Sequence, residues 1–237
     1  MGGATAAASL DRRHVRRRET IEEVVAHALE IMAEEGVAGL SLGEIARRMG
    51  IRPPSLYVYF SSKNALYDEI FRRGWDALIA HMTAYNVQPQ PGDDLATILA
   101  EESSRHARWS MDHRAFAQLM FWRPVPGFEP SPAAYQPAMR YYALILDRFR
   151  GLQELGLIRP DADAAAAMAQ WTVIISGVVS QQLANAPDET FDHGRFTGQL
   201  PGLAAMFAAH YATPRGGSRR APKTTPTTAR RGHARTR

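Results

Sequence analysis

Two adjacent prolines, Pro53 and Pro54, constrain the fold of this chain more than any other local feature. A proline disfavours helical backbone at the residue before it, so no helix is expected to run through Arg52. Gly50 lies just upstream, and glycine commonly ends a helix because it adopts left-handed backbone without a steric penalty. The segment 42–60 is therefore predicted to form two very short helices separated by a tight turn.

The expected ends of these two helices follow from capping residues. Ser41 is a typical N-cap, and Glu44 three residues later completes a capping box, which predicts a helix over 42–49. Pro54 suits the first turn of the second helix, predicted over 54–60, because the N–H that proline lacks has no helical partner there. Two short helices joined by a glycine-containing turn form a helix-turn-helix, whose second helix enters the major groove of DNA.

The rest of the chain shows helical spacing of apolar residues from residue 18 onward and no strand-like alternation of useful length. The first helix is expected to stop at Gly36, and a long helix to begin after a cap at Ser61 or Ser62. Further helices are predicted over 94–111, 113–122, 137–155, 163–185 and 201–211. The predicted fold class is therefore all-α, with a three-helix unit in front of a larger helical bundle.

Composition limits the chemistry that we expect. The chain has no cysteine, which excludes disulfides and thiolate metal sites, and we expect a cytoplasmic protein with no metal and no cofactor. The patterns HExxH and the P-loop are absent, and the serine of the one GxSxG match, GLSLG at 39–43, is the N-cap Ser41, so no catalytic residue is assigned. His81, His106 and His113 are interpreted as solvated or hydrogen-bonded side chains. A helical enzyme with an appended DNA-binding unit remains a weaker alternative.

Charge is concentrated at the two ends of the chain. The net charge is +4, and eight Lys and Arg residues lie in 213–237 without any acid, so the remainder sums to −4. This tail is rich in Pro, Gly and Thr, cannot bury apolar surface and is predicted to be disordered. Residues 1–15 are expected to form a flexible arm. The basic cluster 12–18 either contacts DNA or is a solvated arm, and the sequence leaves both open.

The segment LSLGEIARRMGIRPPSLYVYFSSKNALYDEIF, residues 40–71, resembles the DNA-binding domain of the TetR family of bacterial regulators. The resemblance covers about residues 16–70 of the sequence. The matching positions form a polar cap, an Ile-Ala pair, a Gly-Ile turn, a small polar residue, a Leu-Tyr pair, a Phe, and a Lys before a Leu. They are Ser41, Ile45, Ala46, Gly50, Ile51, Ser55, Leu56, Tyr57, Phe60, Lys63 and Leu66.

The resemblance implies that Ser41, Tyr57 and Lys63 contact DNA phosphates. It also implies base or backbone contacts from Arg52, Pro53, Ser55 and Tyr59. Pro53 departs from the pattern because it cannot hydrogen-bond a base edge, which leaves an apolar contact such as a thymine methyl. Arg18 of the basic cluster is a further candidate. Taken alone, Tyr57 and Tyr59 could equally pack in a core.

The resemblance further implies a helical C-terminal domain that dimerises and binds a small effector. The uncharged helix 163–185 is apolar or small on nearly every side, and together with 201–211 it is expected to form half of an intermolecular four-helix bundle. The candidate interface residues are Ile175, Val178, Val179, Gln182, Leu203, Met206 and Phe207. Burial of both helices inside a monomer core is the alternative. The uncharged segment is also long enough to cross a bilayer, but its Gln, Ser and Thr residues argue against a membrane span.

Aromatic and Met residues gather around a proline-rich break and suggest a pocket for an apolar or aromatic effector. The candidate ligand-binding residues are Phe116, Met120, Trp122, Tyr135, Met139, Tyr142 and Trp171. An acidic effector could pair with Arg123, Arg140 or His113, and the sequence does not decide between these ligand types.

The expected function is that of a homodimeric repressor of a palindromic double-stranded DNA operator, released by a small-molecule effector. An activator or a ligand-independent regulator of the same fold is the alternative. The expected domains are an arm, a helix-turn-helix unit, an effector-binding and dimerisation domain, and a basic tail. They cover 1–15, 16–62, 63–212 and 213–237.

Overall fold

The computed structural model describes residues 2–84 and 87–214, and for residues 2–12 it describes the backbone alone. Within these ranges the chain folds into nine α-helices and no named strand, with one isolated antiparallel bridge between Ile158 and Ala212. The all-α prediction is therefore confirmed. The predicted tail 213–237 lies outside the described residues from 215 onward.

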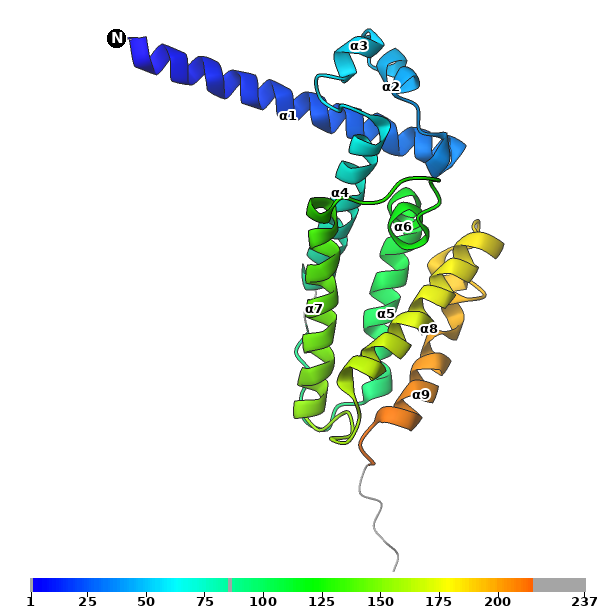
Figure 1. Ribbon diagram of the computed structural model, residues 1–237. Coiled ribbons are helices and arrows are strands. Elements are labelled where there is room, and N and C mark those ends of the chain that lie inside the picture. The colour runs from blue at the N-terminus through cyan, green and yellow to red at the C-terminus, as the bar shows by residue number, and fades with distance from the viewer. Residues whose placement is uncertain (1, 85–86, 215–237) are drawn as a thin grey trace, which may run out of the picture.

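The N-terminal unit contains three helices. α1 spans Gly2–Glu35, α2 spans Leu42–Arg48 and α3 spans Pro53–Leu56. Figure 1 shows α2 and α3 together at one end of the molecule, across α1 from the helical body. Residues 2–15 are part of α1, in the segment for which a flexible arm, 1–15, was expected. No proline lies between residues 4 and 35, and the Ala-rich start favours helix.

The body is built on a helix that leaves the N-terminal unit and runs its length. This helix, α4, spans Lys63–Ala84, and Figure 1 shows it descending beside α7. The remaining body helices are α5 Leu95–Asp112, α6 Arg114–Trp122, α7 Pro132–Glu154, α8 Ala164–Asn185 and α9 Leu200–Tyr211. α8 and α9 lie on the side of the body away from α4.

One hydrophobic cluster joins the N-terminal unit to the upper body. It runs from Val24 and Ile31 of α1 through Leu56 to Phe71 of α4 and Tyr141 of α7. A second cluster in the lower body joins α5, α7, α8 and α9. Because the first cluster crosses from unit to body, α4 packs into the N-terminal unit and into the body at once.

Two predicted helix boundaries are wrong. α3 ends at Leu56, because the backbone N–H groups of Tyr59 and Phe60 both bond to the Leu56 carbonyl and close a turn. α7 begins at Pro132 rather than Pro137, because Ser131 caps it by accepting a hydrogen bond from the Ala134 N–H. Pro137 therefore lies inside the helix, in its second turn, where it has no N–H to donate to the Ala133 carbonyl.

Candidate nucleic-acid interface and ligand cavity

α2 is held against α1 by Arg48, which also binds Glu44 in the first turn of α2. Ser41 accepts a hydrogen bond from the Glu44 N–H at 3.4 Å, as an N-cap does. The Glu44 carboxylate binds Arg47 at 2.7 Å and Arg48 at 3.0 Å instead of returning to Ser41, so the predicted capping box is only half formed. Hydrogen bonds from Arg47 and Arg48 lower the pKa of Glu44 to about 2. Arg48 also pairs with Glu34 of α1, which ties the two helices together.

The turn between α2 and α3 depends on Gly50. Its φ is 67°, in the left-handed region, and the next N–H, that of Ile51, reaches back to the Ala46 carbonyl at 3.0 Å. Ile45 and Leu56 are both fully buried, one on each side of this turn. The turn and its buried pair therefore hold α3 at a fixed angle on the surface of the unit.

The polar candidates of α3 lie on the surface. Arg52, Pro53 and Ser55 are exposed at the start of this helix, and Tyr57, which follows it, is 55% exposed. Ser41, at the start of α2, is exposed as well. The structure thus leaves these five side chains free to meet a partner, in the geometry that a helix-turn-helix requires.

Tyr59 and Arg18 differ from that group. Tyr59 is half-buried against the hydrophobic cluster, and the Arg17 guanidinium lies 5.4 Å from the centre of its ring. Arg17 also donates a hydrogen bond to the Val58 carbonyl at 3.2 Å. Arg18 is exposed on α1. The basic segment of α1 therefore touches the α3 turn through Arg17.

Lys63 is less free than the sequence suggests. Its Nζ donates a hydrogen bond to the Ala38 carbonyl at 3.1 Å and lies 5.5 Å from the centre of the Tyr67 ring. An ammonium group has three donors, so two of them stay available for a phosphate. The DNA contact of Lys63 stays a prediction.

Sequence reasoning missed two residues on this surface. Val58 is 68% exposed, an apolar side chain next to the polar α3 surface. Arg17 holds the backbone of the same turn. Val58 lies between two candidate residues, Tyr57 and Tyr59, and this position was the available signal. It was missed because the helix was predicted to continue to residue 60, whereas α3 ends at Leu56.

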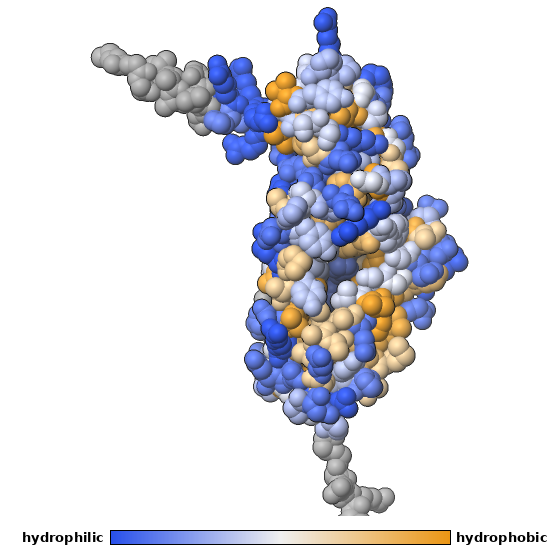
Figure 2. Space-filling model, viewed as in Figure 1, coloured by the Kyte–Doolittle hydropathy of each residue, from blue (hydrophilic) through white to orange (hydrophobic). Residues whose placement is uncertain are grey.

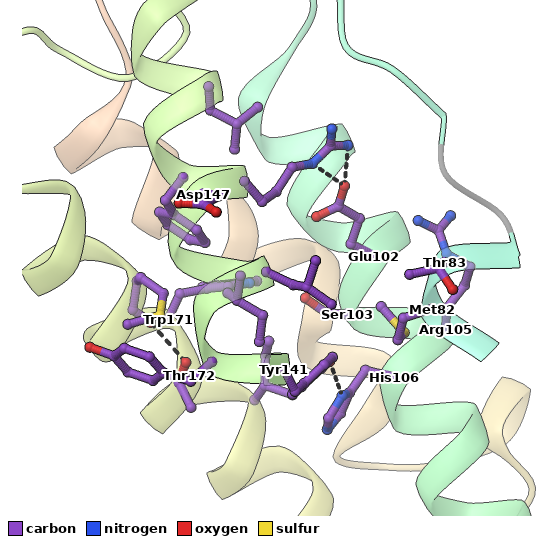
Figure 3. A pocket seen from close by; sticks show the side chains of 18 of the residues that line it. Met82, Thr83, Glu102, Ser103, Arg105, His106, Tyr141, Asp147, Trp171 and Thr172 are labelled. Atoms are coloured by element: carbon purple, nitrogen blue, oxygen red, sulfur yellow. Dashed lines mark hydrogen bonds and ion pairs between the residues drawn. The ribbon is translucent and has the colours of Figure 1, made fainter. Parts of the chain in front are cut away.

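The body contains a cavity of about 500 Å³. Side chains from α4, α5, α6, α7 and α8 line it, and Figure 3 shows labelled residues of α4, α5, α7 and α8 around it. Figure 2 shows a hollow in the middle of the body with apolar residues around its lower edge. The volume falls within the range of small-molecule sites. The Phe, Tyr and Trp residues of the lining are Trp75, Phe121, Tyr141, Tyr142, Phe149 and Trp171.

Two of the seven candidate ligand-binding residues lie at this cavity, and the ligand-binding role itself stays a prediction. Tyr142 and Trp171 line the cavity. Five others do not: Phe116, Met120, Trp122, Tyr135 and Met139. They lie within a single stretch of the sequence, 116–139, whereas residues from five separate helices line the cavity.

Each of the five excluded residues has another place in the fold. Phe116 and Met120 pack against Gly74 of α4. The Trp122 indole donates a hydrogen bond to Ser180 of α8 at 2.7 Å. Tyr135 stacks on Phe71, with 6.0 Å between ring centres. Met139 is 52% exposed on α7.

The lining of the cavity includes the neutral side chain of His106. His106 Nδ1 lies 3.1 Å from the Tyr141 hydroxyl, and its ring stacks near Phe121 and Tyr141. Burial of the ring, with a smaller contribution from the positive charge of His81, lowers the pKa of His106 to about 4. The reading of His106 as a hydrogen-bonded histidine therefore agrees with its surroundings. Nearby, Arg148 pairs with Glu102 through Nε at 2.9 Å.

The candidate dimer residues divide into two groups. Val178, Val179, Gln182 and Phe207 are buried inside this single chain and offer no surface to a second copy. Ile175 and Leu203 are half-buried, and Met206 is 61% exposed. Composition does not show which face of a helix points inward, so it does not distinguish the four buried residues from the others.

The exposed face of α8 and α9 is made of other residues. Val173 is 71% exposed, and the face around it consists of small or polar side chains. They are Ala166, Gln170, Gly177 and Gln181 on α8, and Gly202, Ala205 and Ala209 on α9. In the single chain the uncharged helix is thus buried on one side only.

In the parts of the chain that the structure describes, one helix has the length and apolar composition of a membrane span, Ala164–Asn185. The core helix of a soluble protein meets the same criteria. Among the same residues, no cluster of three or more His, Asp or Glu side chains could hold a metal ion.

A helix-turn-helix unit joined by a long helix to an α-helical body with a cavity is the arrangement of a helix-turn-helix transcriptional regulator. Residues 24–70 match the family described as bacterial regulatory proteins, tetR family. The chain therefore belongs to the tetR family of bacterial regulatory proteins.

Individual relatives match only part of this chain. The uncharacterised HTH-type transcriptional regulator YobS of Bacillus subtilis is 37% identical over 81 residues, which cover 34% of this chain and 42% of that protein. The class D tetracycline repressor of Escherichia coli is 39% identical over 162 residues, 68% of this chain and 66% of that protein. The chain thus spans less than half the length of YobS.

The fold is also found in solved structures. A protein with unknown function from Rhodococcus sp. RHA1 superimposes with a TM-score of 0.66 at 18% identity, covering 81% of this chain and 95% of that one. At this identity the likeness concerns the fold alone.

Proposed function

We propose that the protein is a homodimeric repressor that binds a DNA operator and is released when a small molecule fills the cavity. One observation carries the proposal: α4 begins at Lys63 beside the α3 surface and lines the cavity with Trp75 further along. These two residues are roughly 18 Å apart along the helix. Because such a regulator acts on the chromosome, we place it in the cytoplasm.

The DNA contacts follow from the exposed surface of the N-terminal unit, 16–62. The Arg52 guanidinium suits bidentate contact with a guanine edge, and the hydroxyls of Ser55 and Tyr57 suit phosphate oxygens. Pro53 offers an apolar contact to a thymine methyl. Base contacts would specify the sequence, and phosphate contacts would set the register.

The dimer would form through α8 and α9. Val173 and Met206 are 71% and 61% exposed, and large apolar side chains on one face favour burial against protein. Small residues such as Gly177 and Ala205 allow two helix pairs to approach closely. Gln170 and Gln181 on the same face suit a protein partner better than lipid.

Release would require a ligand that prefers one arrangement of the body over another. A ligand shifts a conformational equilibrium only by its difference in affinity for the two states. α4 is the element that both sites share, so a ligand-induced tilt of α4 would change the spacing of the two α3 helices in a dimer. The sign of regulation depends on where the operator lies, and activation remains the alternative.

Selection from a randomised duplex pool tests the proposal. The full-length protein should enrich a two-fold symmetric sequence whose half-sites lie about 34–36 Å apart, one helical turn of DNA. The enriched sequence, placed over a promoter, should lower reporter expression. Recovery of no common sequence, or of a single asymmetric half-site, would contradict the dimeric repressor.

A further inference from the structure

The polar groups of the cavity point to the chemistry of its ligand. Two side chains of the lining have a buried nitrogen with no hydrogen-bond partner among the described residues, the Trp75 Nε1 and the Arg105 Nε. An indole N–H and a guanidinium can only donate hydrogen bonds. A buried donor without an acceptor is costly, so both groups favour an occupant that supplies acceptors.

The charges of the cavity add a second constraint. The lining contains two arginines, Arg105 and Arg148, and two acids, Glu102 and Asp147. Glu102 pairs with Arg148. Asp147 is 71% exposed and bonds Arg150 at 3.3 Å, so water and Arg150 already solvate it. In the part of the chain that the structure describes, no carboxylate forms an ion pair with Arg105.

The walls select the remainder of the ligand. Trp75 contacts Phe121 and Tyr141, with ring centres 5.7 and 5.6 Å apart, and Trp171 closes the side formed by α8. Aromatic walls of this kind favour a ring-containing ligand through offset or edge contacts. Figure 3 shows Arg105 on one side of the cavity and Trp171 on the other.

We propose that the cavity binds a ring-containing organic acid whose carboxylate pairs with Arg105 and whose second, neutral acceptor receives the Trp75 N–H. Arg105 supplies a charge-assisted hydrogen bond, which is stronger than a neutral one. This assignment rests on the proposed function for its role in regulation, but the binding site itself is independent of DNA. Arg123, Arg140 and His113, the earlier candidates for an acidic effector, do not line the cavity.

The probe for this proposal is 4-benzoylbenzoic acid, which carries two rings, a ketone and a carboxylate. Its methyl ester keeps the rings and the ketone but removes the charge. Quenching of the tryptophan fluorescence reports binding, because Trp75 and Trp171 line the cavity. The full-length protein should bind the acid about ten- to a hundred-fold more tightly than the ester, as expected for one hydrogen bond to a charged group.

Variants separate the two contacts. Arg105→Met should abolish the preference for the acid while leaving ester affinity within about two-fold. Trp75→Phe keeps an aromatic wall and should weaken acid and ester alike; it is followed by calorimetry, because it removes a reporter. Arg195→Met, a change at an exposed arginine whose partner Glu189 also lies outside the lining, serves as the control and should preserve both affinities.

The outcomes separate this inference from the proposed function. Equal affinity for acid and ester, no binding of either, or an equal loss of both in Arg105→Met overturns the organic-acid assignment. If neutral compounds release the protein from its operator in that case, the repressor proposal survives. If the acid binds through Arg105 and DNA affinity stays unchanged at saturating acid, the ligand assignment stands and release of the operator by this ligand class fails.

Discussion

The buried hydroxyl of Tyr67 donates a hydrogen bond to the backbone carbonyl of Val37, with 2.6 Å between the two oxygens. Tyr67 lies in the first turns of α4, and Val37 lies in the link between α1 and α2. Burial raises the pKa of Tyr67 to about 12, so the hydroxyl stays protonated and remains a donor at neutral pH. This bond attaches α4 to the DNA-facing unit within two turns of Lys63.

Replacing Tyr67 by Phe should therefore destabilise the fold. The Val37 carbonyl would remain buried without its donor, which costs about 1–3 kcal/mol. Urea unfolding followed by circular dichroism measures the change. The matched control is Tyr57→Phe, since the Tyr57 side chain is 55% exposed: it should leave the unfolding free energy within about 0.5 kcal/mol and weaken DNA binding only. Equal stability of both variants would contradict the role given to Tyr67.

Lys63→Ala should weaken binding to all DNA sequences and flatten the salt dependence of affinity by about one unit of slope. The reason is that the Lys63 ammonium group has three N–H donors, and the bond to the Ala38 carbonyl uses only one of them. Fluorescence anisotropy with labelled operator at several salt concentrations measures the slope. Arg52→Ala is the contrasting variant and should change sequence preference, while Arg150→Ala, on α7, should change neither. An unaltered salt slope for Lys63→Ala would mean that the lysine serves the fold alone.

Much of the N-terminal unit could be predicted because its signals are local. Ser41, Gly50 and the two prolines act on residues within one or two turns of themselves, and the structure places α2 and the following turn where they indicate. Asp94 and Asp163, which cap α5 and α8, likewise lie at the predicted starts of these helices. Local capping chemistry is readable without knowing the tertiary structure.

The cavity could not be predicted in this way. Trp75, Arg105, Tyr141 and Trp171 come from four different helices, and only packing brings them together. The prediction grouped aromatics by proximity in sequence and so selected residues such as Phe116, Met120 and Tyr135, which pack against α4. One signal was present, since Trp75, Ile79 and Met82 lie at helical spacing on a single face of α4.

The close approach of α4 and α6 makes Gly74 irreplaceable at that position. A Cβ added there would lie 2.8 Å from Phe116 Cδ1 and closer still to Met120 Sδ. Gly74→Ala should therefore destabilise the protein by about 1–3 kcal/mol, as overpacking does, despite the better helix propensity of alanine. Gly151→Ala is the control, because open space surrounds that position on α7. Thermal unfolding of the two variants decides the point: a more stable Gly74→Ala protein would mean that α6 moves away without cost.

Gly177 tests the proposed dimer without disturbing the single chain. It is exposed on α8, and nothing within 4 Å would meet an added Cβ. Gly177→Leu should therefore preserve or slightly improve helix stability while blocking close approach of a second α8. Sedimentation velocity should show a shift from dimer to monomer at micromolar concentration, with an unchanged circular dichroism spectrum. Ala143→Leu, an exposed change on α7, should leave the assembly intact; a dimeric Gly177→Leu protein would place the interface elsewhere.

His106 makes stability depend on pH in a definite direction. Its pKa is lowered to about 4 in the folded protein, against 6.5 for an unperturbed histidine, so the unfolded chain takes up a proton first as pH falls. The stability that the protein has with His106 neutral is present in full above about pH 6.5. It is lost progressively between pH 6.5 and 4, as the unfolded chain binds the proton more readily than the folded one. The loss of unfolding free energy is about 3 kcal/mol at most, because each unit of pKa shift corresponds to about 1.4 kcal/mol. Water that enters the cavity reduces this loss. Urea unfolding at pH 7.5 and pH 5.0 measures it. His106→Gln keeps a hydrogen-bonding side chain without the titration and should reduce the difference between the two pH values; a difference equal to that of the unaltered protein would assign the pH dependence to other groups.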